Sequence, residues 1–130
     1  MATIFSKIVK GEIPSYKIAE NDNCYAFLDI NPIAKGHTLV IPKKEVDYFF
    51  DMDDNLYHEL LDFTKEIAAA LKKTYNCKKV GMAVIGLDVN HAHIHLVPLN
   101  STADMDFSKV TMKFTDEQFQ EIAAEIRANL

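Results

Sequence analysis

The stretch His91-Ala92-His93-Ile94-His95-Leu96-Val97 decides how the rest of the chain is interpreted. Side chains alternate between the two faces of a β-strand, so a strand here places its three histidines on one face. Ala92, Ile94 and Leu96 then share the opposite face, where their apolar character is typical of a core. Because imidazole seldom fills a half-buried sheet surface, the histidine face predicts a site of chemistry.

The segments around this stretch predict a sheet. Extended segments are predicted at 16–19, 24–30, 37–41 and 79–85, and Pro42 and Pro98 are expected to stop the strands before them. The loop at 86–90 is too short for a parallel crossover. The strands on either side of it should therefore form an antiparallel hairpin.

Three helices are predicted beside the sheet. A short amphipathic helix is expected near the N-terminus, ended by Gly11. A 3.6-residue apolar period from about 54 to 75 predicts one long helix, and Thr115-Asp116-Glu117-Gln118 predicts a capping box that starts a C-terminal helix. We therefore expect an α+β fold, with 1–130 as a single domain, in which the helices pack on one face of an antiparallel sheet.

The composition excludes several classes of partner. The chain has 130 residues and a formal net charge of −5, which disfavours long nucleic acid as a ligand. No apolar run is long enough to span a membrane, and the N-terminus lacks the apolar stretch of a signal peptide. Cys24 and Cys77 form no Cys-x-x-Cys pair, so we expect a reducing, cytoplasmic setting.

Two kinds of chemistry use such a row of histidines. A catalytic zinc ion binds imidazole nitrogens at about 2.0–2.1 Å, whereas three alternate side chains of a straight strand spread over roughly 14 Å. At most two of the three could bind one ion, with His37 as a third ligand. Alternatively, one nitrogen of a neutral imidazole attacks phosphorus while the other keeps its proton. In that interpretation His93 attacks, and the flanking histidines bind phosphate or move protons.

The sequence resembles the Hint branch of the histidine-triad (HIT) superfamily. Residues 91–97 match the pattern His-φ-His-φ-His-φ-φ, in which φ is apolar, and blocks at 3–14, 26–32 and 35–43 extend the match. The resemblance covers about residues 3 to 99. It implies a HIT-like fold, a homodimer whose sheets join, and cleavage of nucleoside phosphoramidates or related nucleotides, purine nucleosides being preferred.

The resemblance also implies roles for the histidines. The middle one, His93, is the nucleophile that forms a covalent nucleotidyl intermediate. His95 contacts the phosphate. His91 and His37 help to orient the site and handle protons.

The rest of the implied site binds substrate. Asp29 occupies the position that holds the ribose hydroxyls, and Asp88 lies near the phosphate or the nucleophile. The base pocket has apolar walls, which match Ile4, Phe5, Ile8, Phe27 and Ile30. The expected ligand is a purine nucleoside monophosphate conjugate, with no cofactor.

The chain departs from the family pattern at four places. Ser6 stands where some relatives have a cysteine for zinc, so we expect no metal, and Glu45 replaces a histidine at a position that we do not expect to be catalytic. The hairpin at 85–90 is short, and residues 100–130 end in a helix. These last two differences leave the substrate open, as well as the alternative of a non-catalytic nucleotide-binding or partner-binding module.

Overall fold

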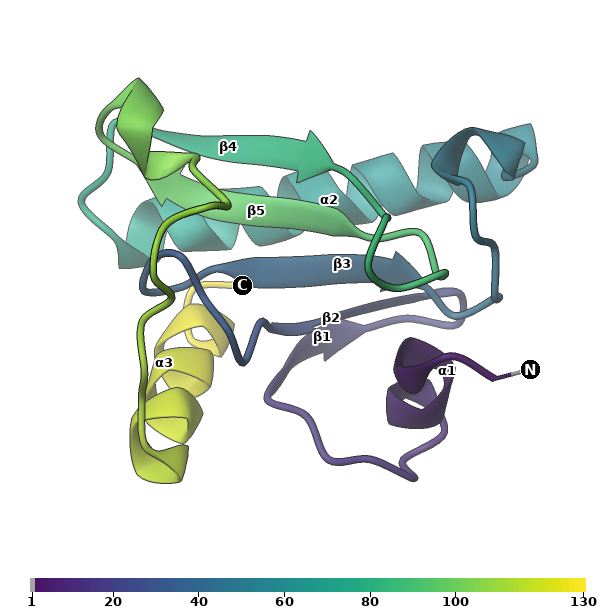
Figure 1. Cartoon of the computed structure of the whole chain (residues 1–130), viewed down its shortest axis with the longest axis horizontal. Helices are drawn as coiled ribbons and strands as arrows, with labels where there is room; N and C mark the ends of the chain where they lie inside the picture. The colour runs from purple at the N-terminus through teal and green to yellow at the C-terminus, as the bar shows by residue number, and fades with distance from the viewer. Residues whose placement is uncertain (1) are drawn as a thin grey trace.

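Five antiparallel strands form one open sheet in residues 2–130, the part of the chain that the computed structural model describes (Figure 1). Their order in the sheet is β1-β2-β3-β5-β4. The strands are β1 (Lys17–Glu20), β2 (Cys24–Leu28), β3 (Thr38–Pro42), β4 (Lys79–Val84) and β5 (Ile94–Leu99). The helices are α1 (Ile4–Val9), α2 (Asp54–Thr74) and α3 (Asp116–Arg127), with short 3₁₀ turns η1 (Phe49–Asp51) and η2 (Thr102–Asp104). The expected α+β fold is confirmed, with its five strands, long central helix and C-terminal helix.

The sheet has an apolar layer on each face. One core cluster joins β1, β2, β3 and β5 to α2 and α3, and α2 runs behind the sheet in Figure 1. The other cluster includes residues of α1, so the prediction that all helices share one face was wrong for α1. The reason lies in β2 and β3, which are buried at every position and therefore need cover on both faces. The cluster on the α1 face consists of Phe5, Ile8, Tyr25, Phe27, Leu39 and Ile41.

Both long helices begin at side-chain caps. Asp53 accepts a hydrogen bond from the backbone N–H of Leu56 at the start of α2. Thr115 and Gln118 form the predicted capping box at the start of α3. Each cap satisfies backbone donors that have no partner within the helix, which stabilises the helix by about 1 kcal/mol.

The strand predicted at 91–97 begins later and ends later than expected. It starts at Ile94 because the residues before it bond to a loop instead of to a strand: the Ala92 N–H donates to the Val46 carbonyl over 2.6 Å. The strand continues through Pro98 to Leu99. β3 pairs with β5 only at residues 94–96, so it does not reach Pro98. At Pro98 the strand therefore has one neighbour, β4, and an edge position tolerates the missing N–H.

The predicted hairpin is present. β4 and β5 pair in antiparallel register from Lys79 opposite Leu99 to Val84 opposite Ile94, and β4 forms one edge of the sheet. Within residues 2–130, no helix combines the length and the apolar character that crossing a bilayer demands.

Candidate active site

A cavity of about 410 Å³ lies on the α1 face of the sheet, which is within the usual range for small-molecule sites. Its walls come from α1, β2, the segment before β3, the hairpin at 85–89 and the segment after η2. Ten of the eleven residues assigned to the site from the sequence line this cavity. They are Ile4, Phe5, Ile8, Phe27, Asp29, Ile30, His37, Asp88, His93 and His95.

His93 is held in one tautomer by the backbone. Its Nδ1 lies 2.8 Å from the carbonyl oxygen of His91. A carbonyl can only accept, so Nδ1 carries a proton, and in the neutral ring Nε2 keeps a free lone pair. The ring is 6 % exposed, lines the cavity and packs edge-on against Phe5 at a centroid distance of 5.1 Å. His93 is therefore arranged as a nucleophile or a base.

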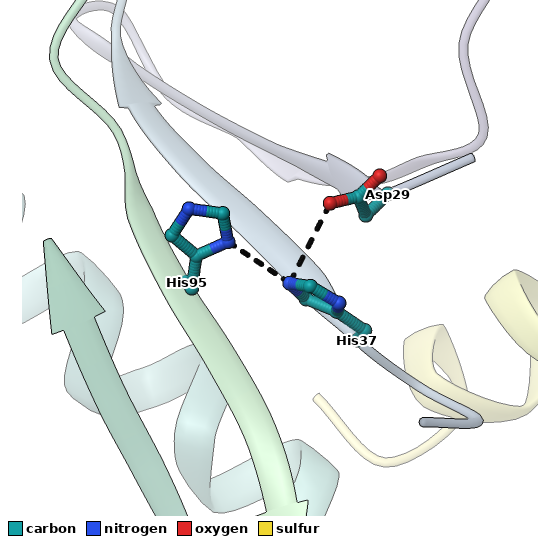
Figure 2. A group of neighbouring side chains, drawn as sticks. All are labelled: Asp29, His37 and His95. Carbon is teal, nitrogen blue, oxygen red and sulfur yellow. Dashed lines mark hydrogen bonds and ion pairs between the residues drawn. The ribbon is translucent and has the colours of Figure 1, made fainter. Parts of the chain in front are cut away.

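The rings of His37 and His95 are hydrogen-bonded to each other, as Figure 2 shows. The Ile33 N–H donates to His37 Nδ1 over 3.1 Å, so the proton of a neutral His37 lies on Nε2. That Nε2–H donates to His95 Nδ1 over 2.9 Å, which leaves the proton of His95 on its own Nε2. Asp29 Oδ2 lies 3.5 Å from His37 Nε2. The pair thus makes His95 a hydrogen-bond donor beside the lone pair of His93.

The two rings are neutral at physiological pH in this arrangement. Burial, with smaller contributions from the charges of His93 and His37, lowers the pKa of His95 to about 3. Burial also lowers the pKa of His37, although the Asp29 carboxylate opposes that shift. An anionic phosphate in the cavity would favour the protonated forms of these rings.

The same group has three potential metal ligands. One atom each from Asp29, His37 and His95 lie within 4.8 Å of one another. However, a histidine that binds a metal through one nitrogen normally donates a proton from the other. His37 Nδ1 instead accepts from Ile33, so the proton occupies the nitrogen that would have to bind the ion. These donors fit a proton-transfer pair better than a metal site.

His91 is the one assigned residue that lies outside the cavity lining. Its ring is fully buried, with Nε2 2.8 Å from the Pro42 carbonyl and Nδ1 2.9 Å from Thr3 Oγ1. The expectation that alternate histidines share one strand face was wrong here, because His91 and His93 precede β5. Only the backbone carbonyl of His91 reaches the ring of His93.

Phe107 and Thr111 line the cavity although no sequence pattern pointed to them. The Phe107 ring packs edge-on against His95 at 4.8 Å and against His37 at 6.0 Å. Both residues lie in an irregular segment with no helical or strand period, held at one end by the Met112 N–H on the Pro32 carbonyl. This segment covers part of the histidine pair and contributes to its burial.

A small cavity on an α+β sheet, with converging imidazoles and apolar walls, defines a site for a small organic ligand. Comparison with known proteins agrees with this class. Residues 10–102 match the family model described as the HIT domain. The chain therefore belongs to the HIT family.

Three relatives illustrate the similarity. The adenosine 5'-monophosphoramidase HNT1 of Saccharomyces cerevisiae is 42% identical over 98 residues, which cover 75% of this chain and 62% of that protein. An uncharacterized HIT-like protein of Borreliella burgdorferi is 36% identical over 135 residues, covering 98% and 97% of the two chains. The crystal structure of a Hit-like protein involved in cell-cycle regulation from Bartonella henselae superimposes with a TM-score of 0.86 at 33% identity, covering 98% and 96%. The predicted similarity to Hint-like proteins of the HIT family is confirmed.

Proposed function

We propose that this chain is a metal-independent hydrolase that cleaves nucleoside 5'-phosphoramidates at phosphorus, with His93 as the nucleophile. The observation that carries the proposal is the hydrogen bond from His93 Nδ1 to the His91 carbonyl, which makes Nε2 the free nitrogen of the neutral ring in a residue lining the cavity. The similarity to a named adenosine 5'-monophosphoramidase supports the substrate class.

The proposed reaction has two displacements. His93 Nε2 bonds to phosphorus as the P–N bond breaks, giving nucleotidyl-His93. The anionic substrate favours a His95 protonated on both ring nitrogens, which gives its Nε2 proton to the departing nitrogen and is left neutral with its remaining proton on Nδ1. Water then attacks phosphorus, the bond to His93 breaks, and the proton released by water passes back through His95. The products are an amine and a nucleoside monophosphate.

The charges around the cavity favour an amine over a phosphate as leaving group. Among the described residues, those that line the cavity include the carboxylates Asp29 and Asp88 but no lysine or arginine. Sites that bind several phosphates usually neutralise them with cationic side chains or metal ions. A phosphoanhydride with further charged phosphates would find no cationic group here to neutralise it, whereas a neutral or cationic amine leaving group needs none.

The remaining walls suit a nucleoside. Phe5, Ile8 and Phe27 form an apolar surface that can hold a purine without reading its edge in detail. Asp29 lines the same cavity, with Oδ1 accepting from the Asn31 N–H and Oδ2 facing His37. A carboxylate at this point can accept hydrogen bonds from ribose hydroxyls.

We further propose that the protein acts as a homodimer. β4 is an edge strand, and Met82, Val84 and Ile85 on it or next to it are 56%, 39% and 47% exposed. An apolar sheet edge is a ready partner for another chain. Sedimentation of the protein near 10 µM (roughly the range where a stable dimer persists) should give twice the mass of one chain.

Turnover of adenosine 5'-phosphoramidate by wild type, His93→Ala and His58→Ala tests the hydrolase proposal. Loss of a nucleophile should lower kcat by several orders of magnitude, on the order of 10⁴ or more. His58 is an exposed histidine on α2, so its variant is the matched control and should keep full activity. Comparable turnover by His93→Ala would rule out the mechanism. Tight AMP binding by an inactive wild type would favour the non-catalytic module.

A further inference from the structure

A hydrogen-bonded cluster outside the cavity ties the start of α1 to the His91 ring. Thr3 Oγ1 lies 2.9 Å from His91 Nδ1 and accepts from the Ser6 N–H over 3.0 Å. Ser6 Oγ donates to Glu45 Oε1 over 2.7 Å, and the Thr3 N–H donates to the same oxygen over 2.8 Å. Four side chains from three separate segments therefore meet at one point.

The acceptors in this cluster determine which atom carries each hydrogen-bonding proton. The Pro42 carbonyl can only accept, so His91 Nε2 donates to it, and in the neutral ring Nδ1 accepts. The Glu45 carboxylate can only accept, so the Ser6 hydroxyl donates its hydrogen bond to it. The Thr3 hydroxyl also lies 3.3 Å from Ser6 Oγ, but the closer contact with His91 Nδ1 receives its proton. The cluster thus holds His91 neutral, with its proton on Nε2.

The orientation of His91 reaches His93 through the backbone. The His91 carbonyl accepts the Nδ1–H that leaves His93 Nε2 free. The Ala92 N–H bonds to the Val46 carbonyl in the loop that also carries Glu45, and the Phe5 ring packs against both histidine rings, at 5.9 and 5.1 Å. The peptide between the two histidines is outside β5, so these contacts hold it where ladder hydrogen bonds do not.

We propose that Thr3, Ser6 and Glu45 are positioning residues that act through His91 to fix the tautomer and orientation of His93. None of the three lines the cavity, so they touch neither substrate nor reacting atoms. Their effect on rate rests on the proposed function, whereas their effect on the two imidazoles does not. Thr3 has the largest proposed effect, because its hydroxyl donates to His91 Nδ1 and so stabilises the tautomer that the Pro42 carbonyl favours at Nε2.

Paired substitutions at Thr3 and Glu45 test this role with two readouts. Thr3→Val keeps the shape of the side chain but removes the donor, and Thr3→Ser retains it. Glu45→Ala removes the acceptor, and Glu45→Gln retains one. The first readout is the ¹⁵N chemical shifts of His91 and His93, which distinguish protonated from unprotonated ring nitrogens. The second is kcat and KM for adenosine 5'-phosphoramidate.

Thr3 also caps α1, so a matched control must lose a threonine cap elsewhere. Thr115 caps α3 in the same way and contacts no histidine, so Thr115→Val serves this purpose. A second control, Thr64→Val, removes a buried hydroxyl whose hydrogen bond goes to the Leu60 carbonyl within α2. Both controls should keep wild-type histidine shifts and wild-type kcat.

Wild type, Thr3→Ser and Glu45→Gln are expected to show a single tautomer, protonated on Nε2 in His91 and on Nδ1 in His93. Thr3→Val and Glu45→Ala should show mixed tautomers, and kcat should fall by about 10- to 100-fold with a smaller change in KM, as expected when a reacting group moves by ~1 Å. Wild-type shifts and kcat in Thr3→Val would overturn the proposal. If wild type turns over no substrate, the hydrolase proposal fails, and the tautomer shifts still decide the role of the cluster.

Discussion

Acidification should destabilise the protein through the buried His95. The ring is 9 % exposed in the folded protein, and burial lowers its pKa from an ordinary 6.5 to about 3. Between those two values the unfolded chain binds a proton that the folded protein does not. Stability contributed by the neutral ring is therefore fully present above pH 6.5 and is lost as the pH falls toward 3.

The size of the effect follows from the width of that window. Each pH unit below 6.5 costs about 1.4 kcal/mol per proton taken up on unfolding. At pH 5 the loss from this one ring is about 2 kcal/mol relative to pH 7, a large share of the ~5–15 kcal/mol that stabilises a typical domain. Burial also lowers the pKa values of His37 and His91, so the loss in wild type should exceed that of one ring.

Urea denaturation at pH 7 and pH 5 measures this loss. The comparison uses wild type, His95→Gln and the exposed-site control His58→Gln, and takes the difference in the free energy of unfolding between the two pH values for each. Any general cost of a substitution cancels in that difference. His95→Gln should lose about 2 kcal/mol less than wild type and His58→Gln on acidification. An equal loss in all three proteins would refute the assignment of His95 as a neutral buried donor.

Three further changes probe the binding groups and the fold. Asp29→Asn should raise KM about tenfold or more for an adenosine phosphoramidate but much less for its 2',3'-dideoxy analogue, because only the first offers hydroxyls to bind; an equal loss on both would exclude a ribose contact. Gly36→Ala should destabilise the protein by roughly 2–4 kcal/mol by urea melts, since a Cβ there would lie 2.4 Å from the Tyr75 ring at a φ of +91°. Gly11→Ala is its control, with a φ of +78° and nothing within 4 Å, so it should cost only the backbone term of about 1–2 kcal/mol. Phe107→Ala should hydrate the histidine pair that it covers and raise the pKa of that pair toward the ordinary value, measurable by NMR titration; an unchanged titration would show that the aromatic ring does not contribute to the burial.

Local pattern was enough to predict most of the framework. The aromatic, branched and apolar residues at 24–30 and 79–85 predicted two strands to within about two residues, because strand propensity and turn chemistry are local properties. The Thr115 capping box was predicted for the same reason. Phe5 and Ile8 were predicted as walls of the base pocket only through the family resemblance, since their apolar spacing alone is equally typical of a core.

Long-range contacts decided what the pattern could not. The peptide around Ala92 bonds to Val46, a residue far away in the chain, so the three histidines do not share one straight strand. As a result the His93 and His95 rings lie 4.9 Å apart, and His91 faces Thr3 instead of the cavity. The contact of Phe107 with His95 comes from a segment without any period, and no local signal could have found it.

The stereochemical course at phosphorus tests the central claim most directly. Hydrolysis of an adenosine 5'-phosphorothioamidate of known configuration in H₂¹⁸O gives a product whose configuration can be assigned by ³¹P NMR. Two successive in-line displacements, first by His93 Nε2 and then by water, predict overall retention. Inversion would mean that water attacks the substrate in one step, and it would contradict a covalent intermediate on His93.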